Sequence, residues 1–205
     1  MTAATVQTLY FPLPALRAMA AAGVIGALTT RFHGVPTNRN QQTTLAVDGP
    51  ELLRRCLADG ADAAVLVANC PVCHQTLSLC ALEAAGISTV VMGCAKDIVE
   101  YVGVPRLLFS DFPLGNAAGR PGDAGSQQQT LTLALQLLAQ GPGPRCTLQS
   151  AQRWHDHAGW KADYGNAALL SAPEIERRRA EFDRGKSQAS QLRQHAGLKG
   201  DAHSE

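Results

Sequence analysis

Two cysteines, Cys70 and Cys73, are separated by two residues and follow a short apolar run over residues 63–68. This run predicts a buried strand, and helical spacing of apolar residues resumes from Cys73 after a sharp turn. A thiol at a helix start lies near unpaired backbone N–H groups and the positive end of the helix dipole, which stabilise a thiolate. The pattern therefore predicts that Cys70 is a nucleophile with a lowered pKa and that Cys73 resolves its adducts as a disulfide, although the reverse order stays open.

Further candidate residues lie beside this pair. His74 could shuttle a proton or pair with the thiolate, with a passive polar role as the alternative. Cys94 ends the next apolar run, and the carboxyl ends of parallel strands share one edge, where ligands bind. A loop after a third run borders the same edge, so the candidate substrate-binding residues are Asn69, Phe112, Pro113, Gly115 and Asn116.

Metal and nucleotide sites are not expected. Cys70, Cys73, His74 and Cys94 could supply four ligands on paper, but the sequence has no second C-x-x-C and no H-x-x-x-H. It also lacks the glycine-rich spacings that hold phosphates. Cys56, Cys80 and Cys146 are predicted to pack as small apolar residues.

These residues depend on alternating short apolar runs and helical stretches, which are typical of a parallel sheet. We expect strands over residues 25–32, 63–68, 87–92 and 106–109. We expect helices over residues 15–22, 50–59, 73–84, 95–101, 127–139 and 174–193, with Gly86 closing the third. The prediction is an α/β fold with a Rossmann-like parallel sheet over residues 1–145, and a helical C-terminal extension with a disordered tail over residues 146–205.

Composition excludes several classes of protein. Hydrophobic residues make up 45% of the sequence and charged residues 17%, as in globular proteins rather than disordered ones. A net charge of +1 argues against nucleic-acid binding. There is no apolar run long enough for a membrane span and no convincing secretory signal, so we expect a cytoplasmic protein whose cysteines serve packing or chemistry.

Several segments together resemble the selenoprotein B subunits of glycine, sarcosine, betaine and D-proline reductases. They cover residues 11–138 and comprise PLPALRAMAAAGVIGAL, NCPVCHQT, STVVMGC and FPLGN. The resemblance implies that Cys70 occupies the selenocysteine position as nucleophile, with Cys73 as its resolving thiol. It also implies reductive C–N cleavage of a small amino-acid-like substrate, activated by a carbonyl group of the pyruvoyl type on a partner subunit. The chain itself would bind no cofactor, would form an oligomeric complex and would receive electrons from a thioredoxin-like protein.

The motif departs from that family at two positions. Cys70 replaces the selenocysteine, and Thr76 stands where the family has a further cysteine. A thiolate is a poorer nucleophile and leaving group than a selenolate, so a related reductive or thiol-transfer reaction fits as well.

Two other functions stay open. Cys70 and Cys94 resemble the strand-end cysteines of aspartate/glutamate racemases, in which two thiols exchange a proton at opposite faces of an α-carbon. A non-catalytic subunit is the third hypothesis, and it predicts an unreactive Cys70.

Overall fold

The computed structural model describes residues 11–37, 39–163 and 167–195 of the chain. The chain divides into two compact units, Met1–Asp156 and His157–Glu205, and each is described separately. Among the described residues, no helix combines the length and apolar character needed to cross a membrane.

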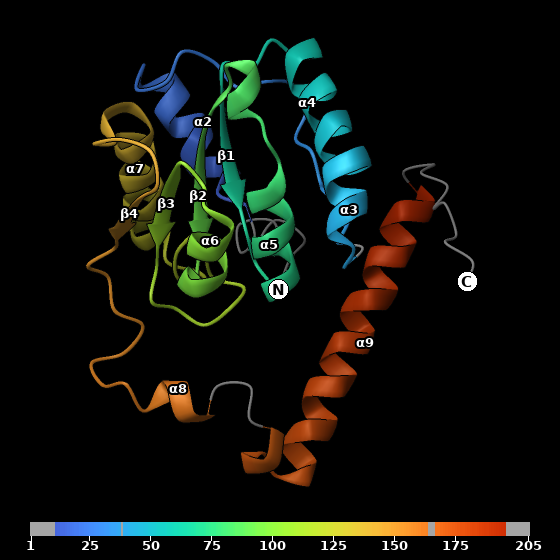
Figure 1. Ribbon diagram of the computed structural model, residues 1–205. Helices are drawn as coiled ribbons and strands as arrows, with labels where there is room; N and C mark the ends of the chain where they lie inside the picture. The colour runs from blue at the N-terminus through green and yellow to red at the C-terminus, as the bar shows by residue number, and fades with distance from the viewer. Residues whose placement is uncertain (1–10, 38, 164–166, 196–205) are drawn as a thin grey trace. The chain divides into compact units, whose positions relative to one another are not determined.

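A four-stranded parallel sheet forms the centre of the first unit (Figure 1). Its strands are β1 (Ala63–Val67), β2 (Ser88–Gly93), β3 (Arg106–Phe109) and β4 (Cys146–Gln149), in the spatial order β1-β2-β3-β4. Val65 pairs with Val90, and Val91 pairs with Leu107. The α/β class with a parallel sheet is confirmed.

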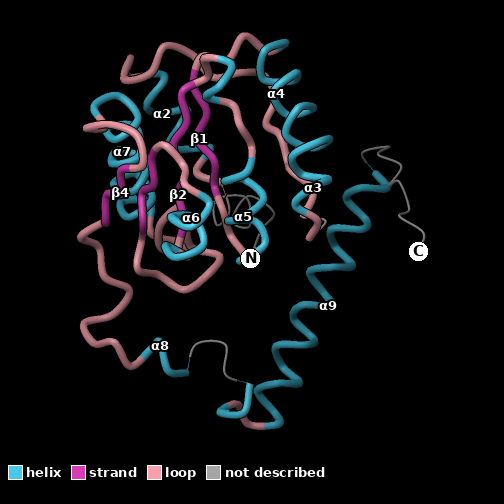
Figure 2. The backbone as a smooth tube through the Cα atoms, viewed as in Figure 1, coloured by secondary structure: helices cyan, strands magenta, loops and turns pink. Residues whose placement is uncertain are grey.

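Helices cover both faces of this sheet (Figure 2). Along the chain they are α2 (Leu13–Ala21), α3 (Gln41–Thr43), a π-helical stretch (Thr44–Asp48), α4 (Gly49–Ala58), α5 (Pro71–Leu79), a 3₁₀ turn (Glu83–Ala85), α6 (Lys96–Val102) and α7 (Ala124–Gln140). The predicted helices over 15–22, 50–59, 95–101 and 127–139 overlap α2, α4, α6 and α7. The helix predicted over 73–84 is shorter, and Gly86, with φ of 85°, ends the following 3₁₀ turn.

The two faces have separate apolar cores. Val90, Met92 and Leu108 pack with residues of α2 and α7 on one face. On the other face, Val91 and Leu107 pack with Val99 of α6 and with Val104, which follows that helix. Helix α5 also lies on this face. Each strand from β1 to β4 is added on the same side of the one before it. The helices α5 and α6 lie on one face of the sheet and α7 on the other, so the β3–β4 crossover has the opposite handedness to the two crossovers before it. Crossovers are almost always right-handed, so this connection is unusual, and its long loop passes over the carboxyl edge of the sheet.

The strand predicted over residues 25–32 is wrong. Ile25 and Leu28 do pack against the core, but at a spacing of three rather than two, and the segment joins no ladder. Among the described strands, β1 is therefore an edge strand and is half-buried, whereas the equally apolar β2 is buried from Thr89 onward.

The fourth strand was not predicted. Its sequence, CTLQ, has little β-branched character and follows a Gly/Pro loop. It pairs with β3 from Arg106 to Phe109, so the sheet extends beyond residue 145.

The second unit is helical. It contains α8 (Trp160–Asp163), a 3₁₀ turn (Ala167–Leu169) and α9 (Ala172–His195). The helix predicted over residues 174–193 is therefore confirmed. The predicted disordered tail lies outside the described residues.

Candidate functional site

The turn between β1 and α5 carries Cys70 as the helix N-cap. The backbone of Cys70 is extended, with φ of −120° and ψ of 165°, and Pro71 takes the first helical position, where a missing N–H costs nothing. The Cys70 Sγ accepts a hydrogen bond from the backbone N–H of Cys73 at 3.2 Å. A cysteine thus fills the role that serine, threonine, asparagine or aspartate usually has at this position.

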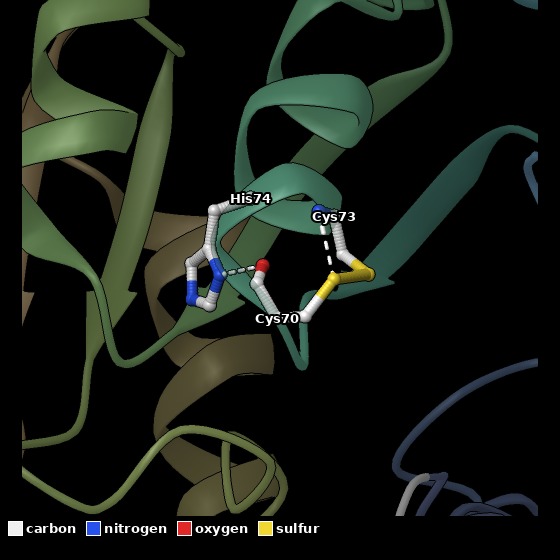
Figure 3. The surroundings of a disulfide bond; sticks show 3 residues. All are labelled: Cys70, Cys73 and His74. Atoms are coloured by element: carbon white, nitrogen blue, oxygen red, sulfur yellow. Dashed lines mark hydrogen bonds between the residues drawn. A yellow bond between two sulfur atoms is a disulfide. The ribbon is translucent and has the colours of Figure 1, made fainter. Parts of the chain in front are cut away.

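Cys70 and Cys73 are joined as a disulfide in this structure (Figure 3). Their Cα atoms lie 5.0 Å apart, within the usual range for such a bond. Both residues are half-buried. The structure therefore brings the predicted pair together, while their roles as nucleophile and resolving thiol stay predictions.

His74 points away from the disulfide and into the protein (Figure 3). Its side chain is fully buried, and its Nδ1 lies 2.6 Å from the carbonyl oxygen of Cys70. Its Nε2 accepts hydrogen bonds from the backbone N–H groups of Cys94 at 2.8 Å and Ala95 at 3.2 Å. Because Nε2 accepts, Nδ1 carries the proton and the ring is neutral.

The electrostatics of His74 agree with that neutral form. Burial lowers the pKa of the imidazole, against smaller opposing effects of the Cys70 carbonyl and of Asp97. Both ring nitrogens are engaged by backbone groups rather than by sulfur. The predicted proton-shuttle role would therefore require one of these hydrogen bonds to open.

Gly93 is a site residue that the sequence did not reveal. A Cβ at this position would lie 2.8 Å from the Cδ2 of His74 and 3.0 Å from its Nε2. The glycine lets the imidazole lie against the end of β2. A glycine at the end of a buried strand is the signal that could have identified this close approach.

Cys94 lies beneath the loop that contains the FPLGN sequence. Burial raises the pKa of its thiol to about 12, although the backbone amides of Asn116 and Phe112 act in the opposite direction. The side-chain amide of Asn116 donates to the carbonyl of Pro113 at 2.9 Å, and Gly115 has φ of 96°. The predicted loop residues thus shape the cover over Cys94. A thiol that stays protonated is a poor base, which does not favour the racemase hypothesis.

Asn69 links the turn to a large cavity. Its side-chain oxygen is buried and has no hydrogen-bond partner among the described residues. Asn69, Cys73 and Thr76 help to line a cavity of about 830 Å³ that extends along β1. An unpaired amide oxygen in a residue that lines a cavity is suited to accept an N–H group from a ligand.

Three further polar residues that line this cavity, Arg31, His33 and Asp59, were not predicted from the sequence. The carboxylate of Asp59 forms an ion pair with Arg31, and its second oxygen lies 2.9 Å from the Nε2 of His33. The hydrogen bond from Arg31 is the main cause that lowers the pKa of Asp59. The pairs are separated by 28 and 26 residues, so no local spacing could indicate them.

In the described parts of the chain, no three or more His, Cys, Asp or Glu side chains are grouped so as to hold a metal ion. The candidate site comprises the two sulfur atoms, the imidazole of His74 and the cavity.

Comparison with known proteins gives one informative similarity. No protein-family model matches the chain, and no solved structure matches it. The chain is 30% identical over 135 residues to the D-proline reductase subunit gamma of Acetoanaerobium sticklandii, which is 64% of this chain and 56% of that protein. It thus spans little more than half the length of this relative. The similarity supports a relation to that reductase family in broad terms, without singling out the selenoprotein B subunits.

Proposed function

We propose that this chain is a subunit of a reductase complex in which Cys70 and Cys73 alternate between dithiol and disulfide. The observation that supports this most directly is the disulfide at the N-cap of α5, where the Cys73 N–H donates to the Cys70 sulfur. The same N–H would stabilise a thiolate on Cys70 in the reduced protein. Cys70 is therefore the nucleophile in this proposal, and Cys73 resolves the adduct.

The reaction balances with these two thiols. Reductive cleavage of one C–N bond takes two electrons and two protons, which the dithiol provides as it becomes the disulfide. A thioredoxin-like dithiol then reduces the disulfide and completes the cycle. A small amino-acid-like substrate would be presented by a carbonyl group on a partner subunit, at the turn that carries Asn69 and the cysteine pair.

Reaction with an aromatic disulfide tests the thiol pair. Reduced protein should release two equivalents of thionitrobenzoate from 5,5′-dithiobis(2-nitrobenzoate) and end as the Cys70–Cys73 disulfide. Cys73→Ser should release one equivalent from this site and keep a mixed disulfide on Cys70, located by peptide mass spectrometry. Cys146 is also a half-buried thiol. Cys146→Ser is therefore the matched control and should behave like the unaltered protein. An unreactive Cys70 would refute the redox proposal and favour the non-catalytic subunit.

The reductase role needs its own test. The chain should co-purify with a co-expressed carbonyl-bearing subunit, and the complex should consume D-proline with a reduced thioredoxin as electron donor. Cys70→Ser should abolish that consumption while leaving the complex assembled. Activity that survives this substitution would contradict the proposed nucleophile.

A further inference from the structure

We propose that His74 is a positioning residue, which acts through the carbonyl of Cys70 to hold the Cys70 side chain in its helix-capping position. This inference rests on the proposed dithiol–disulfide function, because it concerns how the pair is kept ready to react. The ring does not touch either sulfur in this arrangement. Its effect passes through the backbone of the turn.

The first step is the geometry of the Cys70 carbonyl. Its oxygen accepts two hydrogen bonds from the same residue, one from the backbone N–H of His74 at 3.0 Å and one from Nδ1 at 2.6 Å. Two donors on one oxygen fix the orientation of this peptide group. The ψ of 165° at Cys70 is the extended value that an N-cap requires, and it brings Sγ to the Cys73 N–H.

The second step is the anchoring of the ring itself. Nε2 accepts the N–H groups of Cys94 and Ala95, so the imidazole is bound to the end of the neighbouring strand. The ring is fully buried, and Gly93 leaves it no free space on the side of β2. Movement of the ring would break hydrogen bonds to both strand ends, so the Cys70 carbonyl is held by the sheet rather than by α5 alone.

The consequence concerns how readily the two sulfurs react. A cap that is held in place keeps Sγ of Cys70 beside an N–H donor and within reach of Cys73, which reduces the entropy lost on ring closure. Without the side-chain donor, the turn gains freedom. We expect both the thiolate fraction of Cys70 and the effective molarity of the dithiol against glutathione to fall, the latter about tenfold or more.

Two substitutions separate the halves of the contact. His74→Asn places an amide nitrogen near the position of Nδ1 and keeps the donor to Cys70. His74→Gln can place an oxygen near the N–H groups of Cys94 and Ala95 but loses the short-range donor. Thr130→Val, which removes a buried hydroxyl on α7 without touching the turn, is the control for general destabilisation.

Equilibration with glutathione and the pH dependence of Cys70 alkylation are the measurements. We expect His74→Asn to keep an effective molarity within about threefold of the unaltered protein, and His74→Gln to lower it about tenfold with slower alkylation at pH 7. Equal losses in both variants, no loss in either, or an equal loss in Thr130→Val would overturn the inference.

Amide exchange at Cys73 in the reduced protein gives a readout that does not depend on disulfide formation. The inference requires faster exchange of this amide in His74→Gln than in His74→Asn. If the unaltered protein formed no disulfide with glutathione, the proposed function would fail. The exchange result would still decide whether His74 holds the cap, and equal exchange in the two variants would refute it.

Discussion

Replacement of Gly93 by alanine tests the close contact on which the site geometry depends. The new Cβ would lie 2.8 Å from one ring carbon of His74, a distance that real Cβ atoms essentially never show. The ring cannot yield freely, because both of its nitrogens are hydrogen-bonded. We therefore expect Gly93→Ala to destabilise the fold through one identifiable neighbour.

The size of the effect follows from three contributions. Overpacking at a buried site costs about 1–3 kcal/mol. A shifted ring leaves the N–H groups of Cys94 and Ala95 poorly paired, at about 1–3 kcal/mol for each buried donor that loses its partner. Alanine restricts the unfolded chain and returns about 0.4–1 kcal/mol. With both donors unpaired, these contributions lower the free energy of unfolding by about 2–9 kcal/mol, which is comparable with the roughly 5–15 kcal/mol typical of a domain.

Urea denaturation followed by circular dichroism measures this loss, with an unchanged m-value indicating that only stability has altered. Gly26→Ala is the matched control, because no described atom lies within 4 Å of its added Cβ. In a His74→Ala background the same Gly93→Ala change should lose most of its cost, since the methyl group then enters vacated space. A cost equal to that of Gly26→Ala, or one unaffected by removal of the imidazole, would refute the reasoning.

Three other outcomes are expected. Burial lowers the pKa of His74, so below its ordinary pKa near 6.5 the unfolded chain binds a proton more readily than the folded protein does. The urea midpoint should therefore fall as the pH is lowered from 7.5 to 5, and it should fall less steeply in His74→Asn. Equal dependence of the midpoint on pH in the two proteins would contradict this. Because burial raises the pKa of Cys94 to about 12, iodoacetamide at pH 8 should label it far more slowly than reduced Cys70, as peptide mass spectrometry would show. Asp59→Asn should speed trypsin cleavage after Arg31 at pH 8, because the ion pair that holds this segment is lost; an unchanged cleavage rate would contradict this expectation.

Local patterns were sufficient for much of the fold. The β-branched runs that became β1 and β2, and the cysteine pair at the following turn, are visible in the sequence because each depends on neighbouring residues. Residues 25–32 show the limit of such patterns. Their apolar content resembles that of a strand, but a strand also needs a hydrogen-bonded partner strand. The local sequence does not show whether such a partner is present. In contrast, β4 has little strand-like character in its sequence, but it forms a strand because it pairs with the edge of β3.

The candidate site likewise combines features that depend on neighbouring residues with features that depend on the whole sheet. Cys70 as a helix cap was predictable from the turn, whereas the partners of His74 were not. The N–H groups of Cys94 and Ala95 come within reach only because β2 lies beside β1, and this order is a property of the whole sheet. The contacts of Asp59 with Arg31 and His33 are hidden from sequence reasoning for the same reason.

The position of β1 at the edge of the sheet also bears on how the protein behaves at high concentration. An apolar edge strand offers unpaired backbone groups that another chain can extend, which is a common route to aggregation. The segment containing Arg31 and His33 lines the same cavity as β1, and both side chains contact Asp59. We expect these contacts to limit association between molecules, so light scattering should rise first under conditions that weaken them, such as acid combined with high salt.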